Sequence, residues 1–171
     1  SLGHTQIACI TNAALEFTAP NQRLDGYRDA LTEAGIAYNA DLVRYGDYAI
    51  ESGYSQMNNL LDSRIPFSAA FVASDVLAQG AMTAIHERKL RIPEDISIVG
   101  FDDVPQARFL VPPLTTIHVP AREMAETACE ILVKKITNPD AQLQRVILPT
   151  ALVVRETSGG YQHRFATVPT M

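Results

Sequence analysis

Acidic and hydroxyl side chains follow two apolar segments of the chain at the point where each segment ends. Ser74 and Asp75 close residues 67–73, and Asp102 and Asp103 close residues 95–101. In open parallel sheets the carboxyl ends of the strands converge on one crevice, where ligands bind. If both segments are parallel strands of one sheet, these side chains face the same crevice.

Two further residues join this crevice by the same argument. Tyr48 follows a short strand expected at residues 41–47, and Arg23 stands at the front of a helix expected at residues 22–35. Charged groups hydrogen-bond adjacent hydroxyls in pairs, and an aromatic ring covers an apolar sugar face. The combination therefore predicts a site for a small neutral polyol.

Each of these residues also has a purely structural interpretation. Asp75 and Asp103 each precede a helical segment, so both are predicted to be helix caps rather than ligand contacts. Asp102 lies before the cap position and needs another partner if buried, which favours ligand contact. Arg23 is equally compatible with a surface ion pair, and Tyr48 with ordinary packing.

Catalytic and metal-binding patterns are absent from the sequence. It has no G-x-S-x-G elbow, no phosphate-binding G-x-x-x-x-G-K-[ST] loop, no G-x-G-x-x-G after a strand and no H-E-x-x-H, and its four histidines lack ligand spacing. Cys9 and Cys129 lie in apolar segments and are predicted to be buried, reduced thiols of a cytosolic protein. We therefore expect no enzyme, no cofactor and no metal.

The elements that position the site follow from the hydrophobic pattern. Apolar runs alternate with segments of helical period, which predicts an α/β fold with a mostly parallel sheet flanked by helices. Pro149 interrupts the last apolar stretch and indicates an edge strand or a bulge. Strands are expected at residues 6–11, 41–47, 67–74, 95–101, 114–120 and 145–156, helices at 22–35, 50–63, after 75 and at 121–136, and a loose tail at 160–171.

Length and charge limit the class of protein. The 171 residues, 47% of them hydrophobic, suffice for one compact domain. The formal net charge is -5, whereas a surface that binds DNA is positively charged. No segment is long and apolar enough to span a membrane, and the start lacks a signal-peptide pattern, so we expect a cytoplasmic protein without membrane contact.

Several segments together resemble a known family. "RLDGYRDALTEAGI", "IPEDISIVGFDD" and "PPLTTI" are similar, in order, to the later part of the effector-binding domain of lactose-repressor-type (LacI/GalR) transcription regulators, over residues 3–159. The resemblance implies a periplasmic-binding-protein-like fold, in which two α/β lobes enclose an effector cleft and a helix-turn-helix headpiece binds DNA.

The resemblance also implies roles for the crevice residues. Arg23 matches the arginine that hydrogen-bonds effector hydroxyls or carboxylates, Asp102 its acidic partner and Tyr48 the aromatic residue after "GD". Ser74 stands where many relatives have Asn in an A-N-D motif. The effector is then expected to be a sugar.

Carried over by position, residues 1–159 are the C-terminal portion of the effector-binding domain. They form mainly the C-terminal lobe, whereas helix 121–136 belongs to the N-terminal lobe, most of which lies outside this chain together with the headpiece.

A homodimer is expected, with Val76, Gln79 and Thr83 at its interface; the alternative for these three is core packing. We also expect helix 121–136 to bury its apolar stripe elsewhere, for example against another copy of the chain.

The resulting hypothesis is the ligand-sensing portion of a sugar-responsive regulator, most often a repressor. It reaches DNA only through the headpiece. The alternative is a solute-binding protein of a sugar transport system, which has the same fold. A third reading, an enzyme acting on a small polyol, lacks a nucleophile or metal in the sequence.

Overall fold

One six-stranded sheet organises the chain in the computed structural model, which describes residues 2–13, 16–142 and 145–159. The strand order is β2-β1-β3-β4-β5-β6; all neighbours are parallel except β5 and β6, which run antiparallel. The predicted α/β class and mostly parallel sheet are confirmed. The strands are β1 (Ile7–Thr11), β2 (Val43–Tyr45), β3 (Ala69–Val72), β4 (Ser97–Asp102), β5 (Thr115–His118) and β6 (Ala151–Val153).

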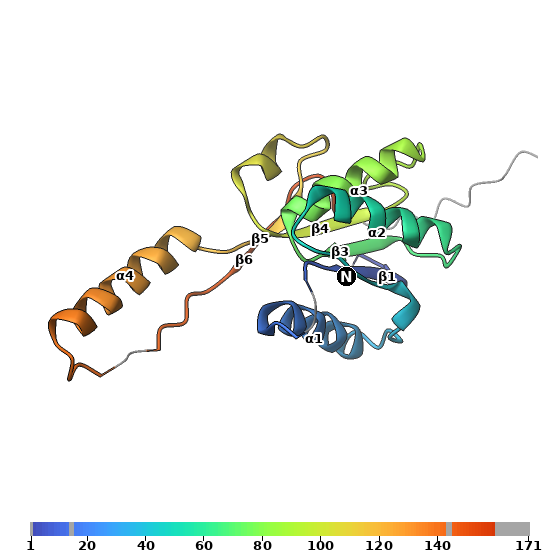
Figure 1. Ribbon diagram of the computed structural model, residues 1–171. Helices are drawn as coiled ribbons and strands as arrows, with labels where there is room; N and C mark the ends of the chain where they lie inside the picture. Colours follow the sequence, from blue (N-terminus) through green and yellow to red (C-terminus); the bar gives the residue numbers. More distant parts are fainter. Residues whose placement is uncertain (1, 14–15, 143–144, 160–171) are drawn as a thin grey trace, which may run out of the picture.

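Helices cover the two faces of the sheet unequally (Figure 1). Two helices, α2 (Ile50–Asp62) and α3 (Asp75–Glu87), pack on one face, and α1 (Thr18–Glu33) lies on the other. Short 3-10 turns occupy Ala40–Leu42 and Pro105–Phe109.

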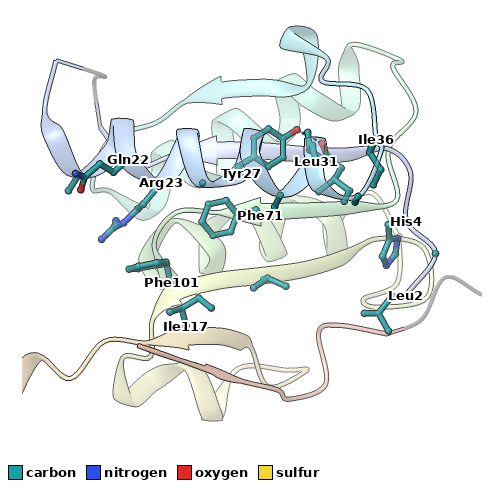
Figure 2. Close-up of a pocket in the computed structure, with 17 residues that line it drawn as sticks. Leu2, His4, Gln22, Arg23, Tyr27, Leu31, Ile36, Phe71, Phe101 and Ile117 are labelled. Atoms are coloured by element: carbon teal, nitrogen blue, oxygen red, sulfur yellow. Dashed lines mark hydrogen bonds between the residues drawn. The ribbon is translucent and has the colours of Figure 1, made fainter. Parts of the chain in front are cut away.

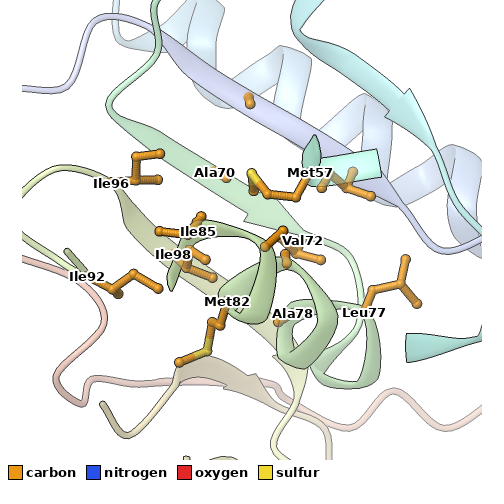
Figure 3. Close-up of a cluster of buried hydrophobic side chains, with 14 of the residues drawn as sticks. Met57, Ala70, Val72, Leu77, Ala78, Met82, Ile85, Ile92, Ile96 and Ile98 are labelled. Atoms are coloured by element: carbon orange, nitrogen blue, oxygen red, sulfur yellow. The ribbon is translucent and has the colours of Figure 1, made fainter. Parts of the chain in front are cut away.

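The larger hydrophobic core lies between the sheet and the α2/α3 layer (Figure 3). The two helices approach closely because glycines stand at their contact. A Cβ on Gly53 would overlap the Leu77 backbone, and one on Gly80 would overlap the carbonyl of Ile50. The core side chains include Met57, Val72, Leu77, Ala81, Ile85 and Ile98.

A smaller core joins α1 to the other face near β1 and β2. Leu24, Tyr27 and Leu31 lie on one side of this helix and are buried with Cys9 and Val43. The helix begins at Thr18, four residues before its predicted start, because proline fits the first turn of a helix and Pro20 lies there.

The last helix, α4 (Ala121–Thr137), stands away from the sheet at the ends of β5 and β6 (Figure 1). No residue of α4 is buried in the described chain, and Met124 and Leu132 of its apolar stripe are 50% and 59% exposed. Cys129 is therefore exposed, and its predicted burial is wrong because the helix finds no packing partner among the described residues; Cys9 is buried as predicted.

The C-terminal strand is shorter than predicted. β6 spans three residues at the edge of the sheet, which confirms the edge position indicated by Pro149. The tail expected at residues 160–171 lies outside the described residues. None of the described helices has the length and apolarity that a membrane crossing requires.

Candidate functional site

Arg23 and Asp102, the charged pair expected in the crevice, lie together at the carboxyl edge of the sheet. Arg23 Nη2 is 3.7 Å from Asp102 Oδ1, and the two side chains are 20% and 37% exposed. The guanidinium also donates a 2.7 Å hydrogen bond from Nη1 to the carbonyl oxygen of Ala73, and its carbon lies 4.1 Å from the centre of the Phe101 ring. Arg23 is thus held from three sides while part of its charge stays accessible.

The turn that carries Asp102 has an unusual backbone. Asp102 and the next residue, Asp103, have φ angles of 116° and 58°. Non-glycine residues at positive φ are uncommon; a strained position costs about 1–3 kcal/mol and persists only where its surroundings fix it. Burial raises the pKa of the Asp102 carboxyl above its usual value, and the Arg23 charge offsets part of that rise.

Asp75 is not the cap of α3, so that prediction is wrong. Ser74 is the N-cap, and its Oγ accepts a 3.2 Å hydrogen bond from the Val76 amide. Asp75 is buried in the first turn, where Oδ1 accepts a 2.6 Å bond from Thr116 Oγ1 and Oδ2 a 2.9 Å bond from the Val104 amide. The carboxylate prefers these partners because they satisfy both of its oxygens inside the protein.

Glycine makes room for this carboxylate. A Cβ on Gly100 of β4 would overlap Asp75 Oδ1. Burial raises the pKa of Asp75, while hydrogen bonds from Thr116 and the backbone act in the opposite direction.

Asp103 is not a helix cap either. The N-cap of the 3-10 turn is Val104, and it makes no side-chain cap bond. Asp103 instead accepts a 2.6 Å bond from Arg155 Nη2 and lies 3.0 Å from His118 Nδ1. Burial acts to raise the pKa of Asp103, but the hydrogen bonds from Arg155 and His118 outweigh it and hold the pKa below its usual value.

The two other predicted contacts, Ser74 and Tyr48, lie differently. Ser74 is buried with its hydroxyl engaged as a cap. Tyr48, in the loop after β2, is 66% exposed, and among the described residues no hydrogen bond or ring contact joins it to Arg23 or Asp102.

A buried amide at the same edge was not anticipated. Asn12, directly after β1, is 5% exposed, and its Oδ1 has no hydrogen-bond partner in the described chain. The only sequence signal was a polar residue after an apolar strand.

Arg23 also closes one end of a groove of about 860 Å³ on the α1 side of the sheet (Figure 2). Leu2 and His4 lie at the opposite end, and Phe71, Phe101 and Ile117 form the floor in the picture. The floor is apolar, so the groove suits apolar side chains, and the polar side chains that the figure labels at its two ends are Gln22 and Arg23 at one end and His4 at the other.

The residues expected at a dimer interface lie on the outer side of α3. Val76 is half-buried, whereas Gln79 and Thr83 are exposed, so core packing does not explain the latter two. Val76 and Gln79 also border a small hollow of about 250 Å³ together with Ile50 and Leu110.

The structure offers no cluster for a metal within its described residues: no three His, Cys, Asp or Glu side chains are grouped to hold an ion.

Comparison with known proteins identifies similar chains. The family model of the periplasmic binding protein-like domain matches residues 1–158. The ribose operon repressor of Escherichia coli K12 is 39% identical over 153 residues, which cover 90% of this chain and 46% of the repressor. The transcriptional regulator CelR of Thermobifida fusca is 37% identical over 155 residues, covering 91% of this chain and 45% of CelR.

Solved structures give the same result. The CelR–cellobiose complex superposes with a TM-score of 0.86 at 37% identity, covering 91% of this chain and 47% of that one. The lac repressor dimer bound to operator and the anti-inducer ONPF gives 0.84 at 37% identity, with 92% and 54% covered. The chain spans about half the length of the curated relatives it matches.

Proposed function

Because this chain belongs to the periplasmic-binding-protein-like family and is similar to LacI-type regulators, we propose that it is the ligand-sensing portion of such a regulator. The effector is a sugar, and the regulator is a repressor. The relatives support this: one is a ribose operon repressor, and another was solved with cellobiose.

The observation that carries the proposal is the half-exposed pair of Arg23 and Asp102. At 3.7 Å the two charges are near one another without a short hydrogen bond, so each keeps capacity for a ligand. The guanidinium offers donors and the carboxylate offers acceptors, which together match two adjacent hydroxyls of a sugar. The Phe101 ring and the Ala73 carbonyl fix the guanidinium before the ligand arrives.

The response to the sugar follows from population shift. In this proposal the sheet with α1, α2 and α3 belongs to one lobe, and α4 belongs to a second lobe. A sugar that contacts both lobes stabilises the arrangement in which they are closed, and it shifts the equilibrium only as far as its affinities for the two arrangements differ. The DNA affinity of a headpiece outside this chain then changes.

The proposed assembly is a homodimer. Val76, Gln79 and Thr83 contribute from the outer side of α3, where Gln79 and Thr83 are exposed in the described part of the chain. The lac repressor was solved as a dimer, which supports the assignment for a similar chain.

Sugar binding by variants tests the proposal. In the complete regulator, a thermal-shift screen of monosaccharides, disaccharides and purines identifies the effector, and calorimetry gives its Kd. Arg23→Ala and Asp102→Ala are each expected to weaken binding about 10- to 100-fold, since a lost charge-assisted hydrogen bond costs about 1.5–3 kcal/mol.

Arg28→Ala is the matched control. Arg28 belongs to the same helix but pairs with Asp25 at the surface. Its loss should leave Kd unchanged. Unaltered affinity in both Arg23→Ala and Asp102→Ala would remove this pair from the site.

A further inference from the structure

The turn that presents Asp102 needs support from outside its own residues. Asp102 and Asp103 are consecutive non-glycine residues at positive φ, directly after β4. Such backbone persists only where neighbouring contacts determine it. The residue after this pair, Val104, has its amide held by the buried Asp75 of another element.

Asp75 is itself fixed from the far side of β4. Its second oxygen accepts the hydroxyl proton of Thr116, which lies on β5 and is fully buried. The carboxylate reaches across β4 at Gly100, where no side chain blocks it. Asp75 therefore connects α3, the turn after β4 and the middle of β5.

The start of α3 contacts both members of the effector pair. The Ala73 carbonyl, two residues before Asp75, accepts the hydrogen bond that orients Arg23. Asp75 holds the amide two residues after Asp102. One short segment thus sets the guanidinium and the carboxylate relative to each other.

We infer that Asp75, held by Thr116, is a positioning residue for the sugar site: it keeps the turn at residues 102–104 in the conformation that directs Asp102 toward Arg23. The inference deepens the proposed function and rests on it. Burying a carboxylate costs free energy unless its oxygens are hydrogen-bonded, and the bonds that Asp75 accepts hold the Val104 amide and Thr116, which an apolar side chain could not do.

Two variants remove the connection, and one controls for stability. Thr116→Val keeps the shape of the side chain but removes the donor to Asp75, and Asp75→Asn weakens its acceptors. Thr115→Val is the matched control, because Thr115 is equally buried on the same strand but its hydroxyl contacts the Arg155 amide and Ser158 instead of Asp75. If Asp75→Asn fails to fold, Thr116→Val still decides.

The first measurement is a crystal structure of each variant of the complete chain. We expect Asp102 to turn away from Arg23 and the φ angles at residues 102 and 103 to change in Thr116→Val, but not in Thr115→Val. An unaltered turn in Thr116→Val overturns the inference.

The second measurement is binding of D-ribose and of cellobiose by the same variants. For whichever of the two sugars binds, Thr116→Val is expected to raise the Kd at least about tenfold. Thr115→Val is expected to raise it less than about twofold, at a similar loss of thermal stability. In an Asp102→Ala background Thr116→Val should cause no further loss, because residues that act through one another are not additive. A full, additive loss in that background shows a merely structural role and refutes the inference.

These outcomes separate the two claims. If Asp102→Ala weakens binding while Thr116→Val and Asp75→Asn do not, the positioning role is wrong and the proposed site stands. If Arg23→Ala and Asp102→Ala both leave affinity unchanged, the proposed site fails. If neither sugar binds, the crystal structures alone decide whether Asp75 holds the turn.

Discussion

At the scale of single residues, three acidic side chains within one small region have three different roles. Asp75 is buried and bonded inside, Asp102 is half-exposed beside Arg23, and Asp103 joins Arg155 and His118. Their sequence positions are alike, each at or just after a strand end. What distinguishes them is the partner that the fold places opposite each carboxylate.

Asp103 gives a prediction on acid stability. Its folded pKa is below its usual value, so its contribution is present above the unfolded pKa of about 3.9 and is lost as the pH falls through the folded pKa. Asp103→Asn should lower the free energy of unfolding at pH 7 by about 1–3 kcal/mol. The deficit should shrink toward pH 3 in urea titrations. Asp29→Asn, on the exposed side of α1, is the control, and an Asp103→Asn deficit that does not depend on pH would contradict the assignment.

The two cysteines are expected to react at different rates. Burial raises the pKa of the Cys9 thiol to about 12, so little thiolate forms near neutral pH, whereas Cys129 is exposed on α4. Ellman's reagent should modify one thiol in the folded chain and two in guanidinium. Cys129→Ser should abolish the reaction of the folded chain; rapid modification of Cys9 would show that β1 is not buried as described.

At the scale of elements, the close contact of α2 with α3 depends on glycines, which have no side chain to keep the helices apart. Gly53 and Gly80 let each helix approach the backbone of the other, which closes the main core. Helix propensity alone disfavours glycine at both positions. The glycines are therefore explained by packing between helices and not by either helix alone.

Substitution at Gly80 tests this contact. Gly80→Ala places a methyl group against the Ile50 carbonyl and should destabilise the chain by about 1–3 kcal/mol, because the helices must separate. Gly26→Ala in α1 is the matched control: its Cβ meets nothing within 4 Å, so higher helix propensity should stabilise the chain by about 0.5–1 kcal/mol. Denaturant unfolding measures both. Equal effects of the two substitutions would contradict the close contact.

At the scale of the whole molecule, two apolar surfaces have no cover in the described chain. One is the groove floor on the α1 side of the sheet, and the other is the stripe of α4. Most helices in proteins owe their stability to packing of an apolar face, and no residue of α4 is buried in the described chain. The stripe therefore requires a partner.

For this chain alone, we predict that copies associate through α4. Sedimentation equilibrium should show a dimer or larger species, and Leu132→Lys with Ile136→Lys should shift it to a smaller species, because charges in the stripe oppose its burial. Glu130→Lys, an exposed charge change on the same helix, is the control. A monomeric wild-type chain with intact α4 would contradict this prediction.

Local pattern accounts for what was predicted correctly. Apolar runs that alternate with segments of helical period predicted the order of strands and helices, because such patterns depend on neighbouring residues alone. The convergence of parallel strands at their carboxyl ends placed Arg23 near Asp102 although 79 positions separate them, and the structure confirms that proximity. The family and fold class were likewise within reach of the sequence, through the motifs in residues 92–117.

Partners distant in sequence were not predictable from the sequence alone. Asp75 seemed to be a cap because its neighbours fit one, but the fold offers it Thr116, 41 residues away, and gives the cap to Ser74. The apolar stripe of α4 indicated burial, and only the arrangement of the whole chain shows that nothing in the described residues covers it or Cys129. Hydrophobic periodicity shows which face of a segment is apolar enough to be buried. Only the tertiary structure shows whether another surface packs against that face.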